Sequence, residues 1–364
     1  MVNFKALFAT IVLSFSLSAL GSPVVREEKS FLTHPITKKT GKSITNILAK
    51  DTARLAHYNK DAAAAVYSGA VTNEDDTYVA AVTVGTQVFS LIVDTGSSNT
   101  WVGAGTKLTG GTSTGKAVTV SYGSGSFSGT EYTDSGELIS QVAKTSSGFT
   151  GVDGIIGFGP VILTENTVTG VTEVPTFLDN LYSQGSISTE VLGVYYTAES
   201  GSDDDDTNGE LTLGGMQTTT GETEYYWGVA VSAITYGTTS LGSGSAIVDT
   251  GTTLIYIPST AYTKFLTASG GKTDSSTGLA IYKTEPTANF SFTIGGTVLS
   301  LTPAEYLIPK AQYTVWGLTG SSYYSWISSG GSSGVDFIIG QKFIENYYTV
   351  FDTTNARVGF AAHA

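Results

Sequence analysis

Two copies of one tripeptide carry the side chains that are best placed for acid and base chemistry. Asp94-Thr95-Gly96 follows the apolar run Leu91-Ile92-Val93, and Asp249-Thr250-Gly251 follows Ala246-Ile247-Val248. Each copy continues with two small hydroxyl residues and then returns to apolar sequence, as expected where a buried strand ends in a loop. The matched contexts favour an internal duplication over the alternative of two unrelated hairpin turns.

Two carboxylates that meet at one place have a defined chemistry. Repulsion between like charges keeps one proton shared between them over a wide pH range. The ionised partner can deprotonate a water molecule while the protonated partner polarises a carbonyl oxygen, so a peptide bond can be hydrolysed without a covalent intermediate. Gly96 and Gly251 let backbone N–H groups approach the carboxylates, and the hydroxyls of Ser97 and Thr252 can donate to their outer oxygens.

Other kinds of catalytic group are scarce in this sequence. The chain has no Cys, which excludes thiol catalysis, disulfides and thiolate metal sites. Of its three His, His34 and His57 lie in the first 60 residues and His363 is the penultimate residue, so neither a Ser-His-Asp triad nor a histidine zinc site is expected. We therefore expect no metal and no cofactor.

The elements that position the two aspartates are expected to be strands. From Asp61 onward the sequence is rich in Thr, Ser, Gly, Tyr and Val, with alternating runs such as 118–122 and 211–213, which favours antiparallel sheet. Short helices are expected over 176–182, 259–266 and 341–346. Because 364 residues exceed what one core usually supports, we predict an all-β fold of two related lobes, 62–219 and 220–364, with a cleft between them.

The N-terminus has the pattern of a secretory signal peptide. One lysine, Lys5, precedes an apolar stretch of fifteen residues from Ala6 to Leu20, and Ala19-Leu20-Gly21 has the form of a cleavage site. The stretch is too short to cross a bilayer, and no later segment or C-terminal tail predicts a membrane anchor. We expect residues 1–21 to be removed and the protein to be extracellular.

The next segment has a charge opposite to that of the rest. Residues 22–60 carry a net charge of +5, whereas residues 61–364 carry −19. A basic leader on an acidic body predicts a removable pro-segment, here 22–61, held by ion pairs; a flexible solvated tail is the alternative. Nucleic acid is not an expected partner, because the acidic body would repel phosphate. A carboxylate paired with the leader has a depressed pKa, so acid should release the leader and leave a start between Asp61 and Val66.

Taken together, the motifs resemble those of the pepsin-like aspartic proteases, within them the cysteine-free secreted group of wood-rotting fungi called polyporopepsins. The resemblance covers nearly all of the body. The segments 94–101 and 249–253 are similar to the two active-site loops, and 120–126 is similar to the flap hairpin. The runs 152–157 and 337–340 resemble the two strands behind the aspartates, and 347–352 with 357–360 resemble the C-terminal strands.

The resemblance implies a pepsin-like fold and a role for each site residue. Asp94 and Asp249 would be the catalytic pair of an acid endopeptidase made as a zymogen, with Thr95 and Thr250 bracing the loops; such enzymes are the standard example of a shared carboxylate proton. Tyr122 would be the flap tyrosine, its hydroxyl reaching toward the Trp101 indole. The cleft would be mainly apolar, lined by Ile92, Ile155 and the glycines around Tyr122, such as Gly123. Ser124 stands where relatives that cleave after lysine carry a carboxylate, so apolar or aromatic residues are expected at the scissile bond.

The resemblance also implies binding partners and a residue of the pro-segment that blocks the active site. Protein and peptide substrates and pepstatin-type inhibitors are expected, and the enzyme is expected to be a monomer. The family often places a pro-segment lysine between the aspartates; Lys50 and Lys60 are both candidates here. Gln341 replaces an aspartate that many relatives carry after the Ile339-Gly340 pair.

Two side features and one rival interpretation complete the sequence analysis. The run 203–209 resembles the opening of a calcium loop, but its twelfth position is Gly215, so a solvated acidic loop is favoured over a metal site. Asn289-Phe290-Ser291 is a possible glycosylation site, unless it lies on a buried strand. A glycan-binding or adhesive β module would explain the composition, but it would not explain the paired aspartate motifs or the basic leader. A protease-like fold that only binds peptides would be favoured by loss of either aspartate, and neither is lost.

Overall fold

The computed structural model describes residues 32–39, 43–58, 77–123, 125–134, 138–198, 207–214, 226–331 and 337–363. Several sequence predictions fall outside these residues. They are the signal peptide, the mature start between Asp61 and Val66, the candidate Lys60, the flap residue Ser124, and the acidic run 203–206.

The largest sheet has twelve strands in the order β22-β21-β9-β10-β1-β2-β3-β8-β4-β7-β6-β5. Its members are β1 (Leu32–Lys39), β2 (Thr77–Val84), β3 (Gln87–Asp94), β4 (Trp101–Val102), β5 (Thr112–Ser121), β6 (Ser126–Asp134), β7 (Leu138–Ser147), β8 (Gly154–Gly157), β9 (Val191–Tyr196), β10 (Thr207–Leu213), β21 (Tyr347–Asp352) and β22 (Arg357–Ala362). The sheet takes strands from both sides of the predicted division at residue 220, because β21 pairs with β9. The lobe boundaries stay a prediction.

Two further sheets come from the second half of the chain. A seven-stranded sheet has the order β17-β16-β11-β12-β20-β13-β19, and a three-stranded sheet has the order β14-β15-β18. The strands are β11 (Gly228–Tyr236), β12 (Thr239–Val248), β13 (Ile255–Ile257), β14 (Lys272–Thr273), β15 (Ala280–Tyr282), β16 (Phe290–Ile294), β17 (Thr297–Leu301), β18 (Tyr323–Ser325), β19 (Ile327–Ser329) and β20 (Phe337–Ile339). The mostly β architecture predicted from the composition is confirmed.

One local arrangement of strands occurs twice. β3 runs parallel to β8, which also pairs antiparallel with β4. In the second half, β12 runs parallel to β20, which also pairs antiparallel with β13. Asp94 ends β3 and Asp249 follows β12. The duplication inferred from the tripeptides is therefore a duplication of structure.

The described helices are few and short, apart from one in the leader. They are α1 (Ile44–Tyr58), α2 (Phe177–Ser183), α3 (Ser259–Ser269), α4 (Pro303–Tyr306) and α5 (Gln341–Ile344), with 3-10 turns η1 (Val161–Thr164) and η2 (Lys310–Gln312). The three helices expected from sequence form; α2 begins with a capping box between Thr176 and Asp179. No helix among the described residues combines the length and apolar character needed to span a membrane.

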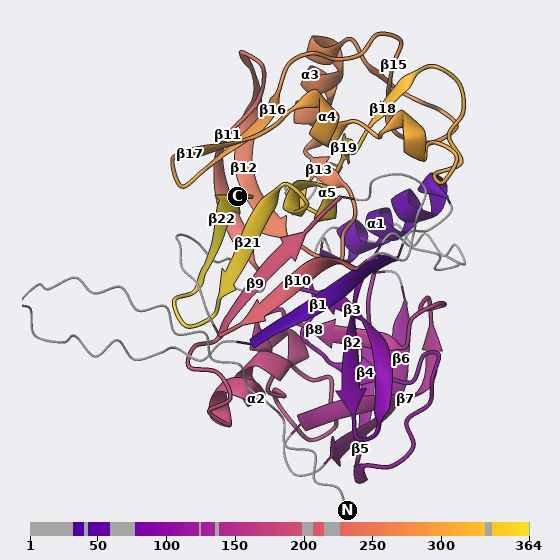
Figure 1. Cartoon of the computed structure of the whole chain (residues 1–364), viewed down its shortest axis with the longest axis vertical. Coiled ribbons are helices and arrows are strands. Elements are labelled where there is room, and N and C mark those ends of the chain that lie inside the picture. The colour runs from indigo at the N-terminus through magenta and orange to yellow at the C-terminus, as the bar shows by residue number, and fades with distance from the viewer. Residues whose placement is uncertain are drawn as a thin grey trace, which may run out of the picture.

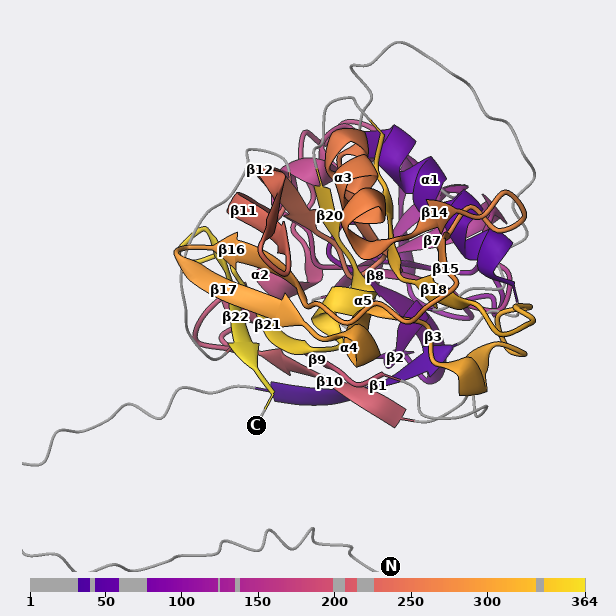
Figure 2. The same cartoon turned by 90° about the horizontal axis from the view of Figure 1, so that it is seen from above.

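The leader is built into the fold. β1 pairs antiparallel with β10 on one side and with β2 on the other. In Figure 1, α1 lies between the purple strands of the first half and the orange elements of the second, and Figure 2 shows the same molecule from above. Ile44, Ile47 and Leu55 of α1 are buried with Trp316 and Trp326. The helix spans fifteen residues and was not predicted.

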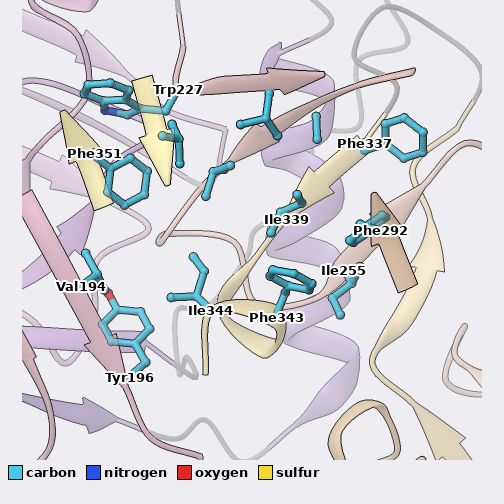
Figure 3. Packing of buried hydrophobic residues seen from close by; sticks show 14 of the residues in the cluster. Val194, Tyr196, Trp227, Ile255, Phe292, Phe337, Ile339, Phe343, Ile344 and Phe351 are labelled. Carbon is cyan, nitrogen blue, oxygen red and sulfur yellow. The ribbon is translucent and has the colours of Figure 1, made fainter. Parts of the chain in front are cut away.

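A hydrophobic core extends behind the ends of the paired strands. Figure 3 shows Phe343 and Ile344 of α5 packed toward Ile339 of β20, with Trp227 and Phe351 nearby. The rings of Trp227 and Phe351 meet edge to face at 5.5 Å, and the Trp227 indole donates to the Phe158 carbonyl at 2.8 Å. These contacts join the two halves, so both strand ends are held by one packed core.

Candidate active site

The two aspartates occupy equivalent, fully buried positions. Asp94 accepts a hydrogen bond from the Gly96 N–H at 3.0 Å and one from the Ser97 hydroxyl at 2.6 Å. Asp249 accepts from the Gly251 N–H at 2.8 Å and from the Thr252 hydroxyl at 2.5 Å. Both carboxylates have no exposed surface. The glycine and hydroxyl contacts expected from the sequence are therefore present in both loops.

The two loops hold each other through Thr95 and Thr250. The Thr95 N–H donates to the Thr250 hydroxyl at 2.9 Å, and the Thr250 N–H donates to the Thr95 hydroxyl at 3.0 Å. Each hydroxyl donates onward to the opposite strand, to Val248 O at 3.2 Å and Val93 O at 2.9 Å. Both N–H groups and both hydroxyls of this buried brace have partners, so the brace fixes the two aspartates relative to each other.

Close packing of strands behind the loops depends on glycine and on one buried amide. A Cβ on Gly157 would lie 2.5 Å from the Ser98 carbonyl carbon, and one on Gly340 would lie 2.2 Å from Leu254 O, so no larger residue fits without a backbone shift. The Gln341 side chain donates to Thr250 O at 2.7 Å. Gln341 therefore supports the second loop with a neutral group.

An arginine from the leader lies between the two aspartates. The Arg54 Nη2 donates to Asp94 Oδ1 at 2.6 Å and to Asp249 Oδ1 at 3.0 Å, while its Nε donates to Asp249 Oδ2 at 3.0 Å. One planar guanidinium thus contacts both carboxylates. The side chain of Arg54 is 8% exposed, so water has little access to this ion pair.

The expectation of Lys50 or Lys60 at this position needs correction. Arg54 provides the cation between the aspartates, and Lys50 is buried one helical turn earlier in α1. The physical reason is that α1, a helix that was not predicted, determines by its phase which leader residue faces the aspartates. Apolar residues at 44, 47, 48 and 55 were the available signal for that helix.

Tyr58 is a second leader residue in the site that sequence reasoning missed. Its hydroxyl donates to Asp249 Oδ2 at 2.7 Å and accepts from Arg54 Nη2 at 3.3 Å. Its ring meets Tyr226 edge to face at 4.7 Å. Burial raises the pKa of Tyr58 well above its usual range, so the hydroxyl stays neutral and acts as a donor.

The charge of Arg54 decides the ionisation of its partner. Burial alone would raise the pKa of Asp249, but Arg54 and the hydrogen bonds from Thr252, Tyr58 and Gly251 hold that pKa below its ordinary value. The carboxylates in turn raise the pKa of Arg54, against the effect of burial. Arg54 of the leader and Asp249 therefore form an ionised pair in this state.

The flap hairpin of β5 and β6 closes over α1. Tyr122 packs against Trp101 with ring centroids 6.4 Å apart and meets Phe149 edge to face at 5.5 Å. The Tyr122 hydroxyl and the Trp101 indole N–H are both buried. Burial raises the pKa of Tyr122 and the nearby indole N–H opposes that rise, as expected from the sequence, although the two groups do not reach full hydrogen-bond geometry. A Cβ on Gly123 would lie 2.5 Å from the Arg54 Cα. The flap backbone therefore rests directly on the leader helix.

A cavity of about 60 Å³ remains between the leader, the flap and the first aspartate loop. The lining residues are Arg54, Tyr58, Gly96, Ser97, Asn99, Val120, Ser121, Tyr122, Gly123, Leu163 and Tyr226. The predicted cleft residues Ile92 and Ile155 are instead buried in a cluster with Trp101, and they do not line this cavity. Val120, Leu163 and Tyr226 give the cavity its apolar walls and were not foreseen.

Comparison with known proteins gives a consistent result. The family model described as eukaryotic aspartyl protease matches residues 77–363. Polyporopepsin from Irpex lacteus is 43% identical, over 80% of this chain and 95% of its own. Pepsin A from Sus scrofa is 29% identical over 84% of this chain and 86% of its own.

The fold has a solved counterpart. The crystal structure of the aspartic proteinase from Irpex lacteus aligns with a TM-score of 0.74 and 36% identity, covering 92% of this chain and 98% of that one. The match includes most of the body in which the two aspartate loops lie.

Proposed function

The chain belongs to the eukaryotic aspartyl protease family, and on that basis we propose that Asp94 and Asp249 form its catalytic pair and that its leader holds the site inactive. Like its pepsin-like relatives, it is an aspartic endopeptidase that hydrolyses peptide bonds in acid. The observation that carries the proposal is the single guanidinium of Arg54 in contact with both buried carboxylates.

The catalytic steps follow from the loop geometry once the leader has left. Asp94 and Asp249 share one proton, because two like charges in one buried site cannot both stay ionised without the cation between them. The ionised carboxylate takes a proton from water, which attacks the peptide carbonyl carbon, and the protonated one donates to the carbonyl oxygen. Collapse of the resulting gem-diol transfers a proton to the leaving nitrogen. Ser97 and Thr252, which donate to the outer carboxylate oxygens, keep both groups oriented.

The leader prevents these steps in two ways. Arg54 and Tyr58 take the carboxylate oxygens that water and substrate would need. The leader backbone in the site is helical, so it is not presented in extended form for cleavage. A chain in this state is a zymogen that does not cut the segment occupying its own site.

Acid release follows from the sign of the Asp249 shift. Its pKa is lowered in the closed form, so the corresponding stability is present above the ordinary carboxyl pKa and is lost as pH falls through the lowered value. The pairing with Arg54 then weakens, and the leader leaves. We propose cleavage between Asp61 and Val66 in a secreted, monomeric enzyme whose signal peptide is residues 1–21.

Substrate preference is proposed from the described cavity walls. Val120, Leu163, Tyr122 and Tyr226 present apolar or aromatic surface beside the aspartates. Such walls favour apolar or aromatic side chains next to the scissile bond, at the expense of lysine. Faster cleavage after lysine than after phenylalanine or leucine in matched peptides would contradict this preference.

Asn289 is proposed as a glycosylation site. It is exposed and directly precedes β16, while Phe290 and Phe292 point into the core. The two possibilities raised by the sequence are therefore compatible, because the acceptor lies just outside the buried strand. Mass spectrometry of protein secreted by a fungal host, compared with Asn289→Gln, tests occupancy.

Substitution of each aspartate tests the catalytic assignment. Asp94→Asn and Asp249→Asn should each lower acid casein hydrolysis by about 10²- to 10⁴-fold or more, because neither variant can share a proton. The leader is removed from each variant by a trace of wild-type enzyme, whose own activity is measured separately and subtracted. Asp274→Asn, half-buried outside the site and hydrogen-bonded to the Ser276 and Thr277 hydroxyls, is the matched control. Full activity in the Asp249→Asn variant would overturn the mechanism, and wild-type activity should be abolished by pepstatin.

A further inference from the structure

A second leader carboxylate is buried beside the active site, and catalysis does not use it. Asp51 lies three residues before Arg54 in α1 and has no exposed surface. Its Oδ1 accepts a hydrogen bond from the Thr253 N–H at 3.1 Å, and its Oδ2 accepts one from the Leu254 N–H at 2.9 Å. Both N–H groups belong to the loop that begins with Asp249.

The contact is independent of the bridge made by Arg54. Residues three apart lie on the same face of a helix, so Asp51 and Arg54 reach the body side by side. Arg54 contacts carboxylates through its charge, whereas Asp51 contacts the backbone. The far side of the same loop is fixed, since the Lys342 N–H donates to Thr253 O at 3.0 Å. Asp51 therefore forms hydrogen bonds with a loop that other contacts of the body hold in place.

We propose that Asp51 is a second, proton-dependent anchor of the leader, which positions α1 so that Arg54 meets the aspartates and which weakens as the solution becomes neutral. The inference rests on the proposed zymogen function and adds a regulatory residue to it. Asp51 is a positioning residue, because it touches neither substrate nor the reacting atoms.

The direction of the pH effect follows from the surroundings of Asp51. The groups that face it are Lys50 and Arg54 on its own helix, the amides of Thr253 and Leu254, and Tyr256 of β13. Burial outweighs these favourable partners and raises the pKa of Asp51 from 3.8 to about 7. A raised pKa gives stability that is fully present below the ordinary value and is lost as pH rises through about 7.

Asp249 and Asp51 respond to pH in opposite directions, so together they define a pH range in which the closed form is most stable. Asp249, whose pKa is lowered in the closed form, favours the open form at low pH. Asp51 favours the closed form at mildly acid pH and less so above neutrality. The leader should therefore be held most tightly in mildly acid solution, between the ranges in which the two groups titrate.

Hydrogen exchange of the full-length precursor tests this anchor. Protection of the segment 250–257, corrected for the intrinsic rate, is measured by mass spectrometry at about pH 5.5 and about pH 8. In the wild type, opening should increase by up to about tenfold per pH unit as pH rises toward about 7, and it should level off above that value. In Asp51→Asn, which removes the ionisable group and one acceptor, protection at the lower pH should fall roughly 10- to 100-fold and the response near neutrality should disappear. Thr52→Ala, exposed on the same helix, is the control and should match the wild type.

The outcomes separate this inference from the zymogen proposal. Equal protection and an equal pH response in Asp51→Asn and the wild type would overturn the role of Asp51, even if acid still converts the precursor to a peptidase. If Asp51→Asn does not fold, the wild-type titration decides alone, and unchanged protection across the range would overturn the inference. A precursor that is never latent contradicts the zymogen proposal itself.

Discussion

At the scale of single residues, the site is made of groups that satisfy one another in pairs. Thr95 and Thr250 exchange hydrogen bonds with each other. The hydroxyls of Ser97 and Thr252 each donate a hydrogen bond to the aspartate of their own loop. The sequence predicted each of these residues, because the tripeptide repeats in matched contexts. It did not predict Arg54 or Tyr58, since their place in the site depends on the phase of α1 and on contacts between residues 40 and 191 positions apart.

Loss of one brace hydroxyl should affect both stability and turnover. Thr95→Val leaves the Thr250 N–H and the Val248 carbonyl without their partner in a site with no exposed surface. We expect the free energy of unfolding to fall by about 1–3 kcal/mol, with kcat reduced more than KM is changed. Urea unfolding and peptide kinetics of the acid-activated enzyme measure both quantities.

The control for this change is Thr145→Val. Thr145 is exposed on β7, and its hydroxyl pairs with Ser128 at the surface. It should leave unfolding and turnover close to wild type. Equal effects of Thr95→Val and Thr145→Val would show that the brace contributes nothing beyond an ordinary hydroxyl.

At the scale of elements, the site forms where two copies of a strand unit meet. The unit of β3, β4 and β8 and the unit of β12, β13 and β20 have the same pairing, and apolar runs before each tripeptide were enough to predict strands at both. The leader elements were harder to predict. β1 has no partner near it in sequence, because it pairs with β2 and β10, and α1 gains its order by packing on Trp316 and Trp326.

A substitution at Gly123 in the flap should destabilise the closed form, in which the leader occupies the site, more than the open enzyme. In Gly123→Ala the added Cβ would lie 2.5 Å from the Arg54 Cα and 2.6 Å from the Ala53 carbonyl oxygen. Both are backbone atoms that cannot rotate away, so the closed form is selectively destabilised. The precursor should shorten itself faster and at higher pH than the wild type, as followed by gel electrophoresis.

Gly330→Ala is the matched control. A Cβ at Gly330 would meet its nearest neighbours at 3.4 to 3.7 Å, one of them Leu55 of the leader, which is ordinary contact. Its shortening rate should stay near that of the wild type. If Gly123→Ala shortened no faster than Gly330→Ala, the flap would not rest on α1 as described.

At the scale of the whole molecule, the leader and the rest of the chain carry opposite net charges. The segment 22–60 carries +5 and the segment 61–364 carries −19, and Arg54 places one of the leader's positive charges between Asp94 and Asp249. The charge split could be predicted from composition, and acid release of the leader stays a prediction. The residue that closes the site could not, because net charge does not specify which cation is buried.

The central claim is that Arg54 keeps the catalytic pair closed, and the most direct test is peptide hydrolysis by full-length Arg54→Gln at about pH 5, before any shortening. The substituted glutamine carries no charge, so it cannot balance two buried carboxylates. We expect the wild-type precursor to be latent at this pH and the variant to hydrolyse a quenched fluorescent peptide at once, with both active and sensitive to pepstatin after acid treatment. A variant as latent as the wild type, or a wild-type precursor that is already fully active, would contradict the claim.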